Sequence, residues 1–326
     1  MQPSMNKQTE NSLIVGIDTS NYTTSLAILS ADGTLLANLK CPLPVSAGER
    51  GLRQSDAVFA HIKNFPSLAN QAKPYLHERR IAGIGVSTRP RPIEGSYMPC
   101  FLSGVCFASA LSLGQSTPVF EFSHQCGHIM AALYSSARIQ WSEKPFCAFH
   151  VSGGTTEVLR VEAASDGNGF LTEHVGGTKD LNAGQVIDRI GVYMGLSFPC
   201  GIEMERLASL YDGKVPKHRM KVTDGFVNLS GLENLACRLY DDTKDKALCA
   251  AFVLDTLADA LQRLASQYLD KYGEMPIVFA GGVMSNERIR ARIEASFLSA
   301  FAEPELSRDN AVGIAELTRR KLTFEK

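Results

Sequence analysis

Two histidines stand four residues apart in the stretch SHQCGHIMAAL, residues 123–133. On a helix this spacing places His124 and His128 one turn apart, so both imidazoles project from the same face. Two imidazoles on one face have the geometry that a pair of metal ligands needs. The small residue Gly127 keeps that face uncrowded. The pair therefore predicts a metal site, and the alternative is two histidines that a helix happens to carry.

A zinc-protease motif is excluded at this pair. The motif H-E-x-x-H needs a glutamate general base directly after the first histidine, and Gln125 in that position cannot take a proton. A third metal ligand could come from the stretch AEPELSRDNAVGIAEL, where we expect Asp309 at the start of a helix. At a helix start, Asp309 could equally serve only as the N-cap.

Two turns of small polar residues follow apolar segments, one in each half of the chain. The first is residues 18–21 and the second is residues 152–155. Backbone N–H groups in such turns can approach a phosphate. Each turn alone could be a plain hairpin, but their repetition suggests a duplicated fold. The expected strands around them are Leu13–Asp18, Thr24–Leu29, Leu35–Lys40, Phe146–Val151 and Thr156–Val161.

Two further segments carry groups suited to a nucleotide. Asp188 lies on a helix expected to begin near Leu181, and Glu205 lies on the next helix, after a loop that ends at Gly201. Carboxylates there could accept hydrogen bonds from ribose hydroxyls, or they could simply be solvated. The stretch FAGGVMSNERIR predicts a strand, a glycine turn and a helix capped by Ser285 or Asn286. Such a helix N-terminus can hold an anion, although a tight connection is the simpler alternative.

Composition limits the function classes. The chain has 326 residues with 33 basic and 34 acidic side chains, so no net field attracts a polyanion, although a local basic face can coexist with this balance. Its eight cysteines form no C-x-x-C pair, which favours free thiols over disulfides or a zinc knuckle. No apolar run suggests a signal peptide or a membrane span. We therefore expect a cytoplasmic protein with no membrane partner.

The ordered motifs resemble the tRNA N6-threonylcarbamoyladenosine synthase family, the TsaD-like proteins once misnamed glycoproteases. The resemblance runs from about residue 13 to residue 316. The motifs that carry it are GIDTS, SHQCGH, VSGGTTEV, AGQVIDRIGVYMGLSFPCGIEMERLA, NLSGLENLA, FAGGVMSNERIR and PELSRDNAVGIAEL.

The resemblance implies an α/β protein with the duplicated actin/Hsp70/sugar-kinase-like ATPase fold. In this fold two RNase H-like domains have a nucleotide cleft between them. We expect the first domain over residues 1–140, with a C-terminal helix over residues 308–326 packing back on it. The second domain is expected over residues 141–307.

The resemblance also implies an activity and its ligands. The activity is metal-dependent transfer of a threonylcarbamoyl group from threonylcarbamoyl-adenylate to N6 of a tRNA adenosine next to the anticodon. One divalent ion, Fe²⁺ or Zn²⁺, would be held by His124, His128 and Asp309. The chain would act on tRNA together with partner proteins, and it could form a homodimer or a heterodimer. No catalytic residue is assigned. ATP, ADP or an adenylate would be held by Val151, Ser152, Gly153, Gly154, Thr155, Asp188, Gly201, Glu205 and Asn286.

His150 is a candidate fourth metal ligand. It directly precedes the Val-Ser-Gly-Gly turn at the end of an expected strand, where some family members place a metal-binding tyrosine. Imidazole is a better neutral ligand than phenol for divalent iron or zinc. The competing interpretation is a histidine satisfied inside the strand by a backbone carbonyl.

Several positions depart from the family's pattern. Asn21 and Tyr22 replace an acidic residue that follows the family's first turn. Gln185 replaces a glutamate, Glu205 an aspartate and Glu233 a lysine. The metal positions are kept, so the acceptor is the feature most open to change. The alternatives are a paralogue that transfers a carbamoyl group to another acceptor, and a non-catalytic nucleotide-binding partner subunit. A scaffold has no use for metal ligands, which speaks against the latter.

Overall fold

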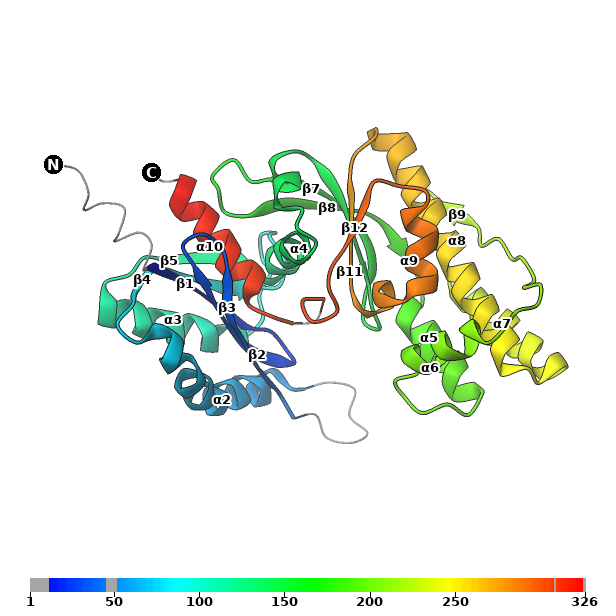
Figure 1. Cartoon of the computed structure of the whole chain (residues 1–326), viewed down its shortest axis with the longest axis horizontal. Helices are drawn as coiled ribbons and strands as arrows, with labels where there is room; N and C mark the ends of the chain where they lie inside the picture. Colours follow the sequence, from blue (N-terminus) through cyan, green and yellow to red (C-terminus); the bar gives the residue numbers. More distant parts are fainter. Residues whose placement is uncertain (1–11, 45–51, 308, 325–326) are drawn as a thin grey trace. The chain divides into compact units, whose positions relative to one another are not determined.

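The computed structural model describes residues 12–44, 52–307 and 309–324. The chain divides into two compact units (Figure 1). Unit 1 comprises residues 1–139, 163–171 and 305–326, and unit 2 comprises residues 140–162 and 172–304. The polar N-terminal tail, in which no signal peptide is expected, lies almost wholly outside the described residues.

Unit 1 is built on a five-stranded sheet in the order β3-β2-β1-β4-β5. β1, β2 and β3 are antiparallel neighbours, while β4 pairs parallel with β1 and β5 parallel with β4. The strands are β1 (Ser12–Thr19), β2 (Thr23–Ser30), β3 (Leu35–Pro42), β4 (Arg80–Arg89) and β5 (Val119–Ser123). The helices are α2 (Gln54–Leu76), α3 (Phe101–Gln115), α4 (His124–Ser135) and α10 (Val312–Phe324), and η1 (Ile139–Glu143) crosses the unit boundary.

Both faces of this sheet are covered, which explains why β1 is apolar almost throughout. Alternate residues of a strand point to opposite faces. Leu13 and Val15 pack with residues of α2 and α3, whereas Ile14 packs with residues of α4 and α10. The sheet is therefore the middle of three layers, with α2 and α3 on one face and α4 and α10 on the other.

Unit 2 contains a seven-stranded sheet in the order β12-β11-β6-β7-β8-β10-β9. Its strands are β6 (Phe146–Val151), β7 (Thr156–Ala163), β8 (Phe170–Thr178), β9 (Val222–Thr223), β10 (Phe226–Val227), β11 (Ile277–Ala280) and β12 (Ser299–Phe301). Its helices are α5 (Ala183–Tyr193), α6 (Gly201–Ser209), α7 (Ser230–Thr243), α8 (Lys246–Tyr272), η2 (Gly282–Ser285) and α9 (Glu287–Glu294).

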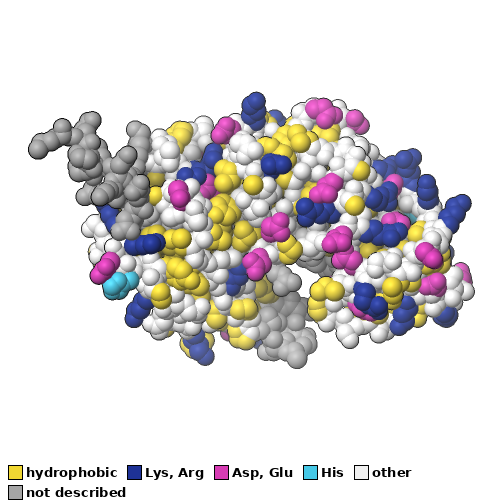
Figure 2. Space-filling model, in the orientation of Figure 1, with side chains coloured by type: hydrophobic (Ala, Val, Ile, Leu, Met, Phe, Trp, Pro, Cys, Tyr) yellow, Lys and Arg dark blue, Asp and Glu magenta, His cyan; other side chains and the backbone are white. Residues whose placement is uncertain are grey.

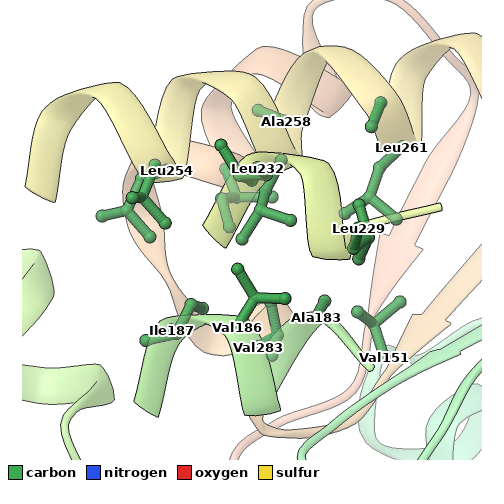
Figure 3. Packing of buried hydrophobic residues seen from close by; sticks show 14 of the residues in the cluster. Val151, Ala183, Val186, Ile187, Leu229, Leu232, Leu254, Ala258, Leu261 and Val283 are labelled. Atoms are coloured by element: carbon green, nitrogen blue, oxygen red, sulfur yellow. The ribbon is translucent and has the colours of Figure 1, made fainter. Parts of the chain in front are cut away.

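The core of unit 2 surrounds α8. Figure 3 shows Leu254, Ala258 and Leu261 of this helix facing residues of α5 and α7, including Val186 and Leu232. α8 ends at Gly273, because a residue at φ +90° favours glycine. The apolar packing holds the starts of α5 and η2 close to the end of β6.

The two sheets repeat one arrangement. The order β3-β2-β1-β4-β5 of unit 1 corresponds to β8-β7-β6-β11-β12 of unit 2. In each, a first strand pairs antiparallel with the second, and the two strands on its other side run parallel to it. The predicted duplicated fold is confirmed, and so are the five strands expected around the two polar turns.

The helix start expected at Asp309 is wrong. α10 begins at Val312, and its first turn is held by Asn310, whose Oδ1 accepts a hydrogen bond from the backbone N–H of Val312 at 2.9 Å. Asp309 precedes this turn, so its carboxylate is not the cap. Its side chain is available for another role.

Within residues 12–44, 52–307 and 309–324, no helix is long and apolar enough to cross a membrane. All eight cysteines are free thiols, as their spacing predicts.

α10 approaches α4 through two glycines. A Cβ atom added to Gly313 would stand 1.8 Å from the carbonyl oxygen of Gly127 and 2.7 Å from the backbone nitrogen of Ala131. Both neighbours are backbone atoms, which cannot move aside as a flexible side chain can. The two helices can pack this closely only because position 313 has no side chain.

We expect Gly313→Ala to lower the free energy of unfolding by at least about 1–3 kcal/mol, the usual cost of overpacking. The matched control is Gly114→Ala on α3, where an added Cβ meets nothing within 4 Å. Since alanine favours helix over glycine, that control should raise stability by about 0.5–1 kcal/mol. Urea unfolding of both variants measures the difference. Equal effects would show that the contact between α4 and α10 is not tight.

Candidate functional site

The start of α4 places the two histidines predicted to bind metal. Ser123 ends β5 and caps α4, because its Oγ accepts a hydrogen bond from the backbone N–H of Cys126 at 3.1 Å. His124 and His128 therefore occupy the first and fifth residues of the helix and face the same way. Their rings are in edge contact, with centroids 4.4 Å apart.

Asp309 joins the two histidines. The Nε2 atoms of His124 and His128 lie 3.0 Å apart. Oδ1 of Asp309 lies 3.3 Å from Nε2 of His128 and 3.7 Å from Nε2 of His124. Within the described residues these three form the group whose ligand atoms all lie within 4.8 Å of one another. The structure thus brings together three of the four metal ligands predicted from the sequence.

These distances, 3.0–3.7 Å, are close to the spacing of ligands around one metal ion. Ligands about 2.0–2.2 Å from a tetrahedral zinc ion stand about 3.3–3.6 Å from one another. The side chains of His124, His128 and Asp309 are 20%, 15% and 22% exposed, so the cluster is open to a further ligand. Two imidazoles and a carboxylate are also a donor set suited to zinc or ferrous iron.

Asp18 is a further member of the site that the sequence did not identify. It is buried, and its Oδ2 lies 2.6 Å from Nδ1 of His124 while its Oδ1 accepts the backbone N–H of Ser20 at 2.8 Å. This partner holds the proton of His124 on Nδ1 and leaves Nε2 free to bind a metal. An aspartate at the end of an otherwise apolar strand was the signal in the sequence, since an unpaired carboxylate is costly to bury.

The charges of the cluster shift its pKa values. Burial alone would lower the pKa of His124, but the charge and hydrogen bond of Asp18 outweigh burial and raise it to about 9. Burial alone would raise the pKa of Asp309, but the hydrogen bond from His128 and the charges of both histidines hold it far below its usual range. A metal ion must therefore displace a proton from His124 below about pH 9.

In unit 2, the polar turn after β6 lies against the start of α5. Oγ of Ser152 accepts the backbone N–H groups of Gly154 and Thr155, and the carbonyl of Ser152 accepts the N–H of Gly184. Gly153 and Gly154 are exposed, and an added Cβ at either would meet nothing within 4 Å. The turn therefore presents open backbone, while the N–H groups of Gly154 and Thr155 are held by Ser152; its role in binding phosphate stays a prediction.

A second glycine turn lies beside the first. β6 and β11 are parallel neighbours, so their carboxyl ends meet at one edge of the sheet. Gly281 follows β11 at φ +99°, and an added Cβ would stand 2.3 Å from the carbonyl oxygen of Val151. Gly282 is exposed beside it with open space around it. Ligands of open α/β sheets bind at such an edge.

The remaining predicted nucleotide ligands lie around α6 and α9. Asp188 accepts the backbone N–H of Cys200 at 2.7 Å, directly before Gly201. Glu205 accepts the N–H of Glu287 at 2.6 Å, and Asn286 is the predicted N-cap of α9, accepting the N–H of Ile289 at 3.0 Å. These side chains organise the helix starts.

His150 lies near the end of β6 in unit 2, whereas His124, His128 and Asp309 belong to unit 1. It stands opposite Glu157 of β7 and beside Ala280 of β11. Its role as a fourth ligand stays a prediction.

Two of the residues that differ from the family's pattern have hydrogen-bond or ion-pair partners nearby. Oε1 of Gln185 accepts the backbone N–H of Asn182 at 3.0 Å, so the amide helps to cap α5. Glu233 forms an ion pair with Arg189 of α5 at 2.8 Å. The replaced lysine position therefore carries a carboxylate that is already paired.

Comparison with known proteins decides the family. The model of the family described as "TsaD: tRNA N6-adenosine threonylcarbamoyltransferase" matches residues 50–316. The chain belongs to this family. A relative from Streptococcus pneumoniae named tRNA N6-adenosine threonylcarbamoyltransferase is 29% identical over 297 residues, covering 86% of this chain and 83% of its own. Members of the family are transferases, and the predicted resemblance is confirmed.

Solved structures agree on the fold. HypF in a phosphate- and nucleotide-bound form has a TM-score of 0.59 at 12% identity, covering 98% of this chain and 56% of its own. A ROK family glucokinase from Streptomyces griseus, in complex with glucose and AMPPNP, has a TM-score of 0.51 at 12% identity, covering 94% of this chain and 99% of its own. The predicted sugar-kinase-like ATPase fold is confirmed.

We expect Asp18→Asn to weaken zinc binding about 10- to 100-fold at high pH, as losses of such outer partners usually do. The difference from the wild type should shrink below about pH 9, because only the wild type must then displace a proton from His124. Chelator competition at several pH values measures both effects. The matched control is Asp32→Asn, an exposed carboxylate of the same unit. Wild-type affinity of Asp18→Asn at high pH would contradict the assigned role.

Proposed function

We propose that this chain transfers a threonylcarbamoyl group from threonylcarbamoyl-adenylate to N6 of a tRNA adenosine beside the anticodon. Family membership supports the reaction class. The observation that carries the proposal is the cluster of His124, His128 and Asp309, with buried Asp18 behind the first histidine. Two imidazoles, a carboxylate and an orienting carboxylate are typical of a working metal site.

One divalent ion, Fe²⁺ or Zn²⁺, is proposed to bind to Nε2 of both histidines and to Asp309. When bound, such an ion supplies Lewis acidity towards a carbonyl or phosphate oxygen. Asp18 keeps His124 in the tautomer that binds metal, and the exposed fractions of the three ligands leave room for a substrate oxygen.

The adenylate is proposed to bind in unit 2. The open turn at Ser152–Thr155 would hold its phosphate once the N–H groups of Gly154 and Thr155 exchange Oγ of Ser152 for phosphate oxygens. Asp188 and Glu205 would accept hydrogen bonds from the ribose hydroxyls with the carboxylate oxygens that do not cap helices. Asn286 and Gly201 would lie at the adenosine. The nucleotide-bound structures with this fold support a nucleotide as ligand.

The proposed transfer is balanced in its bonds and protons. N6 of the tRNA adenosine attacks the carbamoyl carbon, and a new N–C bond forms. The bond from that carbon to the phosphate oxygen breaks, so AMP leaves and N6 loses one proton. The chain's contribution is positioning: the turn after β6 fixes the leaving phosphate, and its open glycines leave space for the acceptor.

His150 is proposed as a fourth metal ligand. It is partly buried at the end of the strand that leads into the phosphate-binding turn, and imidazole is a good donor to either metal. We expect His150→Ala to lower metal content after purification about as much as His128→Ala. The control is His77→Ala, an exposed histidine. Full metal content of His150→Ala, measured by elemental analysis, would leave three protein ligands.

The reaction is proposed to take place in the cytoplasm, where tRNA is modified, and with partner proteins. The net charge of −1 gives the isolated chain little long-range attraction to tRNA. A partner that supplies basic surface would remedy this weakness.

Nucleoside mass spectrometry tests the proposed function. In tRNA from a strain that lacks only this gene, threonylcarbamoyladenosine should disappear and should return with the wild-type gene. His128→Ala and Asp188→Ala should each restore less than about a tenth of it, because one loses a metal ligand and the other a nucleotide contact, whereas His77→Ala should restore it fully. Unchanged threonylcarbamoyladenosine in the deletion strain would reject tRNA as the acceptor. It would leave carbamoyl transfer to another acceptor.

A further inference from the structure

A short loop between α6 and β9 concentrates positive charge in an otherwise balanced chain. Figure 2 shows acidic and basic side chains interspersed over the face that it draws. Many exposed cations of unit 2 have acidic partners close in sequence, such as Arg206 with Glu203, Lys244 with Asp241 and Arg290 with Glu294. Residues 214–221 differ from this pattern, because they contain no acidic residue.

The loop projects its cations outwards. Its apolar residues Val215 and Met220 pack on the core of unit 2, and the guanidinium of Arg263 donates to the carbonyl oxygen of Met220. The charged residues alternate with these anchors and are exposed. None of them has an ion pair within the part of the chain that the structure describes. They are Lys214, Lys217, Arg219 and Lys221.

The loop also forms one wall of a pocket of about 470 Å³. Residues of α8 and of α9 also line this pocket, and Figure 1 shows the loop running along α8. Lys217, His218 and Arg219 line the loop side, and Arg292 lines the α9 side. Three permanently charged groups thus face a cavity whose volume suits a small polar ligand or one unit of a polymer.

Two carboxylates also line the pocket, and they differ in their hydrogen-bond partners. Asp255 is neutralised, because both of its oxygens accept hydrogen bonds from Arg288, at 2.7 and 2.8 Å. Oδ2 of Asp259 is buried and has no hydrogen-bond partner among the described residues. A buried acceptor without a donor is costly, so a rotation of Asp259 that lets a ligand's N–H or O–H group reach this oxygen would stabilise the complex.

We propose that this loop and pocket bind RNA: Lys214, Lys217, Arg219 and Lys221 contact phosphates, and one nucleotide enters the pocket and donates a hydrogen bond to Asp259. A nucleotide unites the two required features, an anionic phosphate and neutral donors on its ribose or base. The choice of RNA rests on the proposed function, which makes tRNA the substrate.

Salt dependence of binding tests the phosphate contacts. Each contact contributes about 0.7–0.9 to the slope of log affinity against log salt concentration. The wild type should bind unmodified tRNA transcript measurably at low salt with a slope near −3, and only weakly at physiological salt. Replacing Lys214, Lys217 and Lys221 with glutamine should make the slope shallower by about 2.1–2.7 and lower affinity at low salt at least tenfold. Fluorescence anisotropy measures both.

The matched control removes the same charge elsewhere in unit 2. Replacing the exposed residues Lys144, Lys244 and Lys271 with glutamine should leave the slope within about half a unit of the wild type. Equal losses in the two triple variants would show that only net charge matters and would overturn the proposal. Absence of wild-type binding at low salt would overturn it as well.

Asp259→Ala tests whether a nucleotide enters the pocket, because the two cases predict opposite changes in RNA affinity. Removing a negative charge should strengthen binding of a polyanion if the pocket stays empty. If a nucleotide donates to Asp259, affinity should instead fall about three- to tenfold with the slope unchanged. A competing single nucleotide, UMP, should displace the transcript poorly. If micromolar UMP displaced the transcript, the pocket would be assigned to a free nucleotide and the RNA proposal would be overturned.

The outcomes separate this inference from the proposed function. Binding is measured on unmodified transcript without any reaction, while the function is measured as threonylcarbamoyladenosine in cellular tRNA. If the triple loop variant restored normal threonylcarbamoyladenosine and kept the wild-type salt slope, RNA binding by the loop would be rejected while the proposed function would stand. Loss of the slope in that variant, together with normal threonylcarbamoyladenosine in the deletion strain, would support RNA binding and reject the proposed reaction.

Discussion

The close contact between α4 and α10 is the constraint on which the candidate metal site depends. His124 and His128 lie on α4, and Asp309 lies three residues before α10 begins. These groups are far apart in the sequence, so only the packing of the two helices can bring them within 3.3 Å. The packing is close because Gly313 lets the helix backbones approach without side chains between them. A helix contact in the core thus sets a distance in the site.

A buried charge supports the same site from the other side. Asp18 lies at the end of β1 in the middle of a covered sheet, where an unpaired carboxylate would be destabilising. Its two oxygens are satisfied by His124 and by the backbone of Ser20, so the strand end, the first polar turn and α4 form one hydrogen-bonded unit. The free energy of burying Asp18 is therefore tied to the orientation of a proposed metal ligand. Loss of either partner would affect stability and metal binding together.

Much of the fold could be predicted from the sequence, because its strands and long helices have clear apolar periods and clear ends. The helix spacing of His124 and His128 likewise indicated a shared face. The position of Asp309 relative to α10 could not be predicted, since Asn310 competes as a cap and only the folded turn shows which of them is used. Asp18 was missed for a related reason. Its partner lies 106 residues further along the chain, and no local pattern reports such a contact.

In unit 2 the side chains proposed to bind the nucleotide also have structural roles. Asp188 and Glu205 each use an oxygen to accept the backbone N–H of a residue at a helix start. An N–H at a helix start needs an acceptor in any case, so the cap holds the carboxylate in one rotamer and one direction. In the proposed nucleotide site, the second oxygen would then be presented rigidly, without the entropy loss that a free side chain would suffer on binding. Glu205, which replaces the family's aspartate, carries its carboxylate one methylene further from the backbone, yet it still accepts the N–H of Glu287 at the start of α9. The structural role therefore limits how far a divergent member of the family can alter this pocket, and the exposed loops around it are freer to change.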